Sequence, residues 1–239
     1  MTETLEHIRR DVVVCERCPR LVRYRRQVAL EKKREFRDEE YWGRPVPGFG
    51  DPNASLVIVG LAPAAHGSNR TGRVFTGDRS AAFLVHGLFE AGFANQPTSL
   101  RRGDGLHYSG AYVTAAVRCV PPDNRPRPEE LEHCLPYLER EFRALARARA
   151  YLALGGFAWE ATLRAAAQVY RVERPKVPFA HGLALPLGPG RPMVWASYHP
   201  SPQNTNTGKL TTPMFVGLLR QIRGSFSGPA GPGGPPSGG

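Results

Sequence analysis

The chain has 239 residues, of which 41% are hydrophobic, and a formal net charge of +11. This length and composition suit one globular domain with a sizeable core and exclude a wholly disordered chain. No apolar run approaches the roughly 18 residues of a membrane span, and residues 1–10 lack the apolar centre of a signal peptide. We therefore expect a soluble, monomeric, cytoplasmic protein. An arginine-rich, strongly basic chain favours nucleic acid as the partner, because guanidinium groups bind phosphates in a bidentate manner.

The first fifty residues are predicted to be mainly helical. Residues 3–14 place their apolar side chains on one face of a helix. A tight turn follows at residues 15–19. The charge-dense residues 20–40 then predict a long surface helix with some i,i+4 ion pairs. The Gly and Pro residues of 43–53 predict a loop.

Strands alternate with helices in the rest of the chain. Continuous apolar runs predict buried strands over residues 56–59, 112–117, 151–154 and 193–197. The helices expected with them cover residues 79–91, about 20 residues from Glu129, an Ala-rich stretch ending near Val169, and residues 212–223. This alternation indicates βαβ units in a parallel sheet, hence an α/β fold. Residues 224–239, nearly all Gly, Pro, Ser and Ala, predict a disordered tail beyond a domain of residues 1–223.

The loop after the first strand, residues 60–67, reads Gly-Leu-Ala-Pro-Ala-Ala-His-Gly. Small side chains leave backbone N–H groups open to a ligand, and ligands of open α/β sheets bind where strands end. An ordinary turn has the same composition. Further along, after a loop over residues 68–77, Asp78 is expected to cap the next helix and Gly92 to end it.

A second loop, beginning at His199, is expected at the same sheet edge because it follows the last strand. A histidine there can donate a hydrogen bond to developing negative charge. The polar and small residues behind it suit a phosphate backbone or a groove. A packing or turn role for His199 is the alternative. Residues 121–128, rich in proline, are expected to form a stiff loop.

Four cysteines indicate a metal site: Cys15, Cys18, Cys119 and Cys134. In a reducing compartment four thiols suggest a metal more readily than two disulfides. The C-x2-C pair lies in a turn, which lets both thiolates reach one centre. Zn²⁺ and a [4Fe–4S] cluster both suit four thiolates, although structural zinc more often uses two close pairs. Structural cysteines without a ligand are the alternative.

Together, residues 60–67, residues 69–78, the segment from His199 to Asn204 and the four cysteines resemble the uracil-DNA glycosylases, specifically the iron–sulfur branch called family 5. The resemblance covers about residues 10–223. It implies a three-layer α/β/α sandwich with a four-stranded parallel sheet, which agrees with the four strands predicted from the residues. It also implies a [4Fe–4S] cluster, rather than zinc, on the four cysteines, which would anchor the N-terminal helices.

The activity implied is that of a monofunctional glycosylase. Such an enzyme flips a nucleotide out of DNA and hydrolyses the N-glycosyl bond of a deaminated base, leaving an abasic site. Phe75 would stack on the base, and His199 would hydrogen-bond the base oxygen that gains charge. The loop residues implied to hold the base are Gly60, Ala62, Pro63, Ala64 and Ala65. Those implied to contact the DNA groove are Pro200, Ser201, Pro202, Gln203 and Asn204. No lyase step is expected, because neither catalytic loop holds a lysine.

Two departures from better-known members of that superfamily affect the expected chemistry. Those relatives carry an acid or Asn just after the first strand, where this chain has residues 61–65, so Asp78 is the candidate for water activation, with helix capping as its alternative role. They also read uracil with an Asn near the end of the second strand. Residues 114–116 offer no amide, and Asn124 is the candidate substitute. We therefore expect acceptance of other deaminated bases such as hypoxanthine. The rival function is a non-catalytic, metal-stapled nucleic-acid-binding module.

Overall fold

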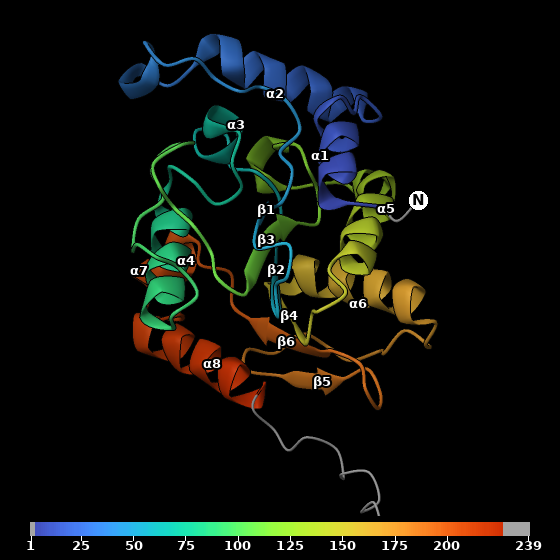
Figure 1. Ribbon diagram of the computed structural model, residues 1–239. Helices are drawn as coiled ribbons and strands as arrows, with labels where there is room; N and C mark the ends of the chain where they lie inside the picture. The colour runs from blue at the N-terminus through green and yellow to red at the C-terminus, as the bar shows by residue number, and fades with distance from the viewer. Residues whose placement is uncertain (1–2, 227–239) are drawn as a thin grey trace, which may run out of the picture.

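Figure 1 shows a sheet with helices on both faces, in a computed structural model that describes residues 3–226. The strands are β1 (Phe49–Gly50), β2 (Leu56–Gly60), β3 (Ala111–Ala115), β4 (Ala150–Leu154), β5 (Ala184–Pro186) and β6 (Met193–Ser197). They lie in the order β1-β3-β2-β4-β6-β5. The four central strands are parallel, and β1 and β5 pair antiparallel at the two edges. The three-layer α/β fold is confirmed, but the sheet has six strands rather than the four predicted.

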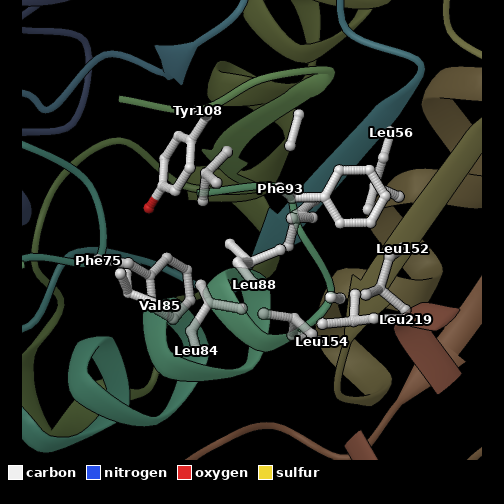
Figure 2. Close-up of a cluster of buried hydrophobic side chains, with 14 of the residues drawn as sticks. Leu56, Phe75, Leu84, Val85, Leu88, Phe93, Tyr108, Leu152, Leu154 and Leu219 are labelled. Carbon is white, nitrogen blue, oxygen red and sulfur yellow. The ribbon is translucent and has the colours of Figure 1, made fainter. Parts of the chain in front are cut away.

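The central strands are buried on both faces, which is why the sequence shows continuous apolar runs instead of alternation. Along β2, Leu56 and Ile58 pack on one side, and Val57 and Val59 on the other. The first side is covered by α4 (Arg79–Glu90) and α8 (Thr212–Ser225), and the second by α5 (Pro128–Ala144) and α6 (Gly156–Tyr170). Figure 2 shows the α4 side, where Leu84 and Leu88 pack in one cluster with Leu56 and Leu219. The sheet is thus a rigid platform with its loops at the carboxyl edge.

The predicted boundaries of α4 are confirmed by its caps. Asp78 precedes the helix, and its Oδ1 accepts the backbone N–H of Ala81 at 2.9 Å. Gly92 follows the helix with φ 76°, a left-handed conformation that ends a helix readily because glycine has no Cβ. Asp78 is therefore fixed at the start of α4, next to the loop that follows β2.

The N-terminal region differs from its prediction. Two helices form as expected, α1 (Leu5–Val13) and α2 (Pro19–Glu31), but the second ends nine residues earlier than predicted. Lys32 adopts φ 51°, and a single 3₁₀ turn follows at η1 (Arg34–Phe36). The chain turns because Tyr41 is buried against the loop after β2, with its hydroxyl 3.0 Å from Nδ1 of His66. A continuous helix would carry Tyr41 away from this contact.

Other differences concern short elements in segments predicted as loops or, for β5, left without a prediction. They are β1 within residues 43–53, α3 (Ser68–Thr71), the 3₁₀ turn η2 (Pro122–Asn124), β5, and α7 (Pro202–Asn206). Each has five residues or fewer, too few for a periodic pattern. Helix α8 reaches Ser225, two residues into the predicted tail, and residues 227–239 lie outside the described part of the chain. Within residues 3–226, no helix combines the length and apolar character that crossing a membrane requires.

Candidate active site

The loop after β2 begins with a close contact between Gly60 and the ring of Phe75. A Cβ on Gly60 would lie 2.5 Å from Cε2 of that ring, which is well inside van der Waals contact. The last residue of β2 must therefore be glycine for the ring to lie on the strand end. This contact places Phe75 at the carboxyl edge of the sheet, where the sequence predicted the floor of the site.

Phe75 is held between the core and the sheet edge. The residue is 9% exposed and belongs to the cluster that contains Leu84 and Val85 of α4 (Figure 2). The centre of its ring is 6.1 Å from that of His199, with an angle of 34° between the planes. The structure thus brings Phe75 and His199 together, although 124 positions separate them in the chain. Its backbone has φ 45°, which is unusual for a bulky side chain.

His199 directly follows the segment after β6 and is fixed through its backbone. Nδ2 of Asn204 donates to the His199 carbonyl at 2.8 Å, and Gly155 leaves the space next to the His199 Cβ. Burial lowers the pKa of His199 to about 4, so the imidazole is neutral at physiological pH. Among the described residues, no protein group hydrogen-bonds to its ring nitrogens. A neutral ring with one free N–H can donate to an oxygen that becomes negative.

Asp78 has two different environments, one for each carboxylate oxygen. Oδ1 caps α4, whereas Oδ2 lies against the backbone of Gly67, where a Cβ would collide with it. Burial raises the pKa of Asp78, an effect that the backbone N–H groups of Ala81 and Ser80 and the charge of Arg70 partly oppose. The capping role is therefore confirmed, and the second oxygen can still meet a water molecule.

A groove of about 1390 Å³ passes along this face of the loop. Its wall includes the predicted site residues Ala64, Ala65, Asp78 and Asn124. It also includes His66 and Gly67 and the cationic side chains of Lys33, Arg70, Arg79 and Arg101. The carboxylates of Glu35, Glu39, Asp78 and Asp104 line the same wall, so its formal charges balance and the groove is not in itself a positively charged surface. The structure thus gathers Asp78 and Asn124 in one groove, whose lining residues do not include Phe75 or His199.

Three predicted loop residues have other surroundings. Ala62 packs against the hydrophobic cluster that contains Cys119 and Cys134, and the side chain of Pro63 is buried. In the second loop, Pro200 is buried as well. The side chains of these three residues support the two loops, so any contact with a base or with DNA is left to their backbone or to their neighbours.

The second loop contains the short helix α7, which changes the roles available to its residues. Ser201 precedes the helix, Pro202 starts it, and Gln203 is exposed. The side-chain amide of Asn204 points back to the His199 carbonyl, so it positions the loop instead of extending toward solvent. Of the five predicted DNA contacts, Gln203 is the side chain most open to an approaching duplex.

Arg70 was not predicted from the sequence as a site residue. Its buried guanidinium donates to the carbonyls of His66 at 2.7 Å and Gly77 at 3.1 Å, and to Glu39 at 2.5 Å. It therefore joins the end of the first loop to the residue before Asp78. Only its place between residues 60–67 and Asp78 could have drawn attention to it, because every one of these contacts depends on the folded chain.

The family model described as the Uracil DNA glycosylase superfamily matches residues 47–223. The chain belongs to this superfamily. It is 51% identical to the Type-5 uracil-DNA glycosylase of Thermus thermophilus over 212 residues, which cover 89% of this chain and 94% of that protein. It is 48% identical to the Type-5 enzyme of Mycobacterium tuberculosis over 213 residues, covering 89% and 78%. A Type-4 uracil-DNA glycosylase of Archaeoglobus fulgidus is 29% identical over 184 residues, covering 72% and 75%. The predicted family and enzyme class are confirmed.

The four cysteines of this uracil DNA glycosylase superfamily member lie near one another and are free thiols. Cys119 and Cys134 are buried in one cluster with Leu21, and Cys18 packs against it. Arg25 donates from Nη1 to the Cys119 Sγ at 3.3 Å and to the Cys15 carbonyl at 3.4 Å. Within residues 3–226, no three His, Cys, Asp or Glu side chains form a ready metal site.

The electrostatics of these thiols suit a cationic centre. Burial raises the pKa of Cys134 to about 12 and that of Cys119 to about 11, and the neighbouring cysteines raise both further. The pKa of Cys18 rises to about 12 for the same reasons. Mutual repulsion of this kind requires the sulfurs to be near one another. Cys18, Cys119 and Cys134 thus resist ionisation alone, and thiols of this kind, with Arg25 beside Cys119, are by their chemistry a donor set that suits a metal centre.

Proposed function

We propose that this chain hydrolyses the N-glycosyl bond of uracil in DNA and leaves an abasic site. The observation that carries the proposal is the pairing of Phe75 with a neutral His199 at the end of the parallel strands. A module that only binds nucleic acid has no need of a half-buried, unprotonated histidine beside an aromatic ring. Membership of the superfamily and the identity to Type-5 uracil-DNA glycosylases support the same substrate.

The geometry supports a mechanism in which the flipped base lies on Phe75. Stacking of a base on an aromatic ring is worth about 1–3 kcal/mol. As the glycosidic bond breaks, negative charge develops on the base oxygens, and His199 donates a hydrogen bond to one of them. Because burial keeps the imidazole neutral, this donation needs no proton to be lost or gained. The sugar becomes cation-like, and water attacks it.

Asp78 is proposed to orient and activate that water. Its Oδ1 is occupied by the N–H of Ala81, but Oδ2 faces Gly67 in the groove wall. Burial raises the pKa of the carboxyl, and a higher pKa makes the carboxylate a better base. We propose that the enzyme is monofunctional, because residues 60–67 and 199–206 contain no lysine, although Lys33 lines the groove. A borohydride-trapped enzyme–DNA adduct would contradict that statement.

We propose further that hypoxanthine is accepted as well as uracil. At the end of β3 the Thr114 hydroxyl donates to Oε2 of Glu141 at 2.7 Å, so it is engaged away from a base, and Ala115 and Ala116 carry no polar atoms. Asn124 lines the groove with φ 55° and is the proposed reader of the base edge. Cleavage of matched oligonucleotides that carry uracil or hypoxanthine tests this, and release of uracil alone would refute it.

Cys15, Cys18, Cys119 and Cys134 are proposed to hold a [4Fe–4S] cluster. When bound, the cluster would supply the fold with a covalent link between α2, the end of β3 and α5. Purified protein should be brown, with broad absorbance near 400 nm and about four iron atoms per chain. Colourless protein that contains zinc would overturn this assignment. The monomeric state and the cytoplasmic location stay predictions from the sequence.

Substitution of the two rings tests the proposed function against the rival binding module. Removal of one such donor typically lowers kcat by about 10²–10³-fold, so His199→Ala should do the same, and Phe75→Ala should lose roughly 5- to 150-fold through lost stacking. Duplex affinity should change little. Exposed His86 and Phe89, both on α4, provide matched controls, His86→Ala and Phe89→Ala, that should retain activity. Full activity of both site variants would refute the assignment of this site.

A further inference from the structure

The backbone of Phe75 is strained, so other contacts in the fold must stabilise this conformation. Its φ of 45° lies in the left-handed region, where the Cβ of an L-residue crowds the following carbonyl. Phe75 is also not free to relax, because its ring lies on Gly60. Conformations of this kind persist only where the surrounding structure determines them. The residues on either side of Phe75 show how this is achieved.

Arg73 and Thr76, which flank the strained segment, belong to one buried hydrogen-bond network. Nε of Arg73 donates to the Thr76 hydroxyl at 2.8 Å, across the residue that carries the strain. The hydroxyl of Ser99 lies 2.8 Å from that of Thr76 and 3.0 Å from Nη2 of Arg73. The side chain of Arg73 is only 6% exposed. The guanidinium therefore closes a small ring around the backbone of residues 73–76.

Asp104 anchors this ring from another segment of the chain. Its two oxygens accept Nη1 and Nη2 of Arg73, both at 2.8 Å. They also accept the backbone N–H groups of Leu100 at 2.8 Å and Leu106 at 3.1 Å. Although burial favours the protonated form, the hydrogen bonds from Arg73 and the backbone hold the pKa of Asp104 well below its usual range. The carboxylate stays charged and keeps the bidentate pair intact at any working pH.

From this geometry we infer that Arg73 and Asp104 are positioning residues that hold Phe75 in the orientation required to stack on a flipped base. Neither side chain hydrogen-bonds to Phe75, and both act through the backbone of residues 73–76. The inference rests on the proposed function, because it assigns stacking to Phe75. A ring fixed before the base arrives need not be ordered during the reaction, so the entropy of ordering is not added to the barrier.

An ion pair that serves only the general stability of the fold would give a different pattern of effects. Loss of such an ion pair would destabilise the protein whatever the orientation of Phe75. It would therefore lower the activity of Phe75→Ala by the same factor as that of the parent protein. A positioning pair acts through one side chain. Its loss should have no further effect once that side chain is absent, which is the non-additivity expected of coupled residues.

The decisive variant is Arg73→Lys, which keeps the charge but loses the planar fork that reaches Asp104, Thr76 and Ser99 together. In single-turnover cleavage of a uracil oligonucleotide we expect the maximal cleavage rate to fall several-fold, by no more than in Phe75→Ala, with the half-saturating enzyme concentration within about twofold. Combined with Phe75→Ala, the same substitution should change the residual rate less than twofold. Equal fold-losses in both backgrounds would overturn the inference while leaving the proposed function intact. If Phe75→Ala alone retains full activity, the proposed function fails instead.

A spectroscopic readout tests positioning without reference to activity. With 4-fluorophenylalanine at position 75, the ¹⁹F resonance should shift or split in Arg73→Lys. The matched control is Arg223→Lys in α8, whose guanidinium donates to the Ala91 carbonyl at 2.6 Å and lies over the ring of Phe93, as that of Arg73 lies over the ring of Phe49. It should leave the resonance unchanged. If Arg73→Lys does not fold, Asp104→Asn provides the same comparison with a near-isosteric side chain. An unchanged resonance in the folded variant would overturn the inference.

Discussion

Replacement of His199 by alanine should remove a specific part of the pH dependence of stability. The pKa of His199 is about 4 in the folded chain, because burial disfavours the charged ring, against about 6.5 for an unperturbed histidine. Above pH 6.5 the ring is neutral in both states. Between pH 6.5 and 4 only the unfolded chain binds the proton, so the free energy of unfolding falls as the pH falls. Below pH 4 both states are protonated and the difference is constant.

The size of this effect follows from the pKa difference. A shift of one pKa unit corresponds to 1.36 kcal/mol, so a difference of roughly 2.5 units contributes about 3 kcal/mol between pH 6.5 and pH 4. This is a large fraction of the 5–15 kcal/mol that typically stabilises a domain. The contribution from His199 is fully present above pH 6.5 and lost as the pH approaches 4.

Urea unfolding at several pH values from 4 to 7 measures the effect. The free energy of unfolding of the parent protein minus that of His199→Ala removes the contributions of all other titrating groups that the two chains share. This difference should fall by about 3 kcal/mol from pH 6.5 to pH 4. The control, His86→Ala, removes an exposed histidine of α4 and reports the effect of the same substitution away from the site.

Parallel curves for the parent protein and His199→Ala would refute the reasoning. They would mean that the imidazole has the same pKa in both states and is hydrated in the folded chain. The proposed donation from a neutral, desolvated ring would then lose its physical basis. If the stability difference does vary with pH as expected, the contribution of His199 to the rate of base release should stay constant through neutral pH and decline only as the pH approaches 4.

Three further outcomes are expected. Asp78→Asn keeps the helix cap, so the free energy of unfolding should change by less than about 0.5 kcal/mol while base release falls at least 100-fold. Asp78→Ala should lower the free energy of unfolding in urea by about 1 kcal/mol more, because it removes the cap. Unchanged base release in Asp78→Asn would leave capping as the only role of Asp78. Gly60→Ala places a methyl group 2.5 Å from the Phe75 ring, so it should lower the free energy of unfolding by about 1–3 kcal/mol and reduce kcat. In the control, Gly217→Ala, the new Cβ meets open space, so the protein should be equally stable or more stable. Duplex affinity, measured by fluorescence anisotropy across salt concentrations, should fall with a log–log slope of about 0.9 per phosphate contacted, and a flat plot would contradict phosphate contacts by the cationic side chains of this basic chain.

Those parts of the fold that depend on local sequence were predictable. The strand at β6 has the predicted bounds, Met193–Ser197, because both of its faces are covered and its apolar run is continuous. The cap at Asp78 was likewise encoded within four residues. The edge strands β1 and β5 were missed because they contain two and three residues and form only where β3 and β6 offer free backbone groups.

The candidate site was predictable in composition but not in its internal support. Loop position and residue type identified His199, whereas Phe75 and the proposed water-activating role of Asp78 came from the resemblance to the glycosylase family. The contacts that fix them join distant segments or need a known loop conformation. Arg73 and Asp104 are 31 positions apart, and the amide of Asn204 reaches the His199 carbonyl only because α7 forms. No periodic pattern encodes pairs of this kind, so they become visible only when the folded chain is described.

Arg25 links the cysteines to the site through one continuous set of hydrogen bonds. Its side chain is 3% exposed and donates to the Cys119 Sγ and to the Gly43 carbonyl at 3.2 Å, while its own carbonyl accepts from Nδ2 of Asn69. The N–H of Gly43 donates to the Asn69 carbonyl at 3.1 Å, which brings this path to the segment before Phe75.

A buried guanidinium is favourable only beside negative charge, and the carboxylate within reach of Arg25, that of Glu16 at 3.7 Å, is mostly exposed. Thiolates held by the proposed cluster would supply the missing charge. Loss of that charge would leave Arg25 buried without an adequate partner and would loosen Gly43 and Asn69 with it. A purely structural cluster would therefore still be needed for base release, and such a requirement is no sign of redox chemistry.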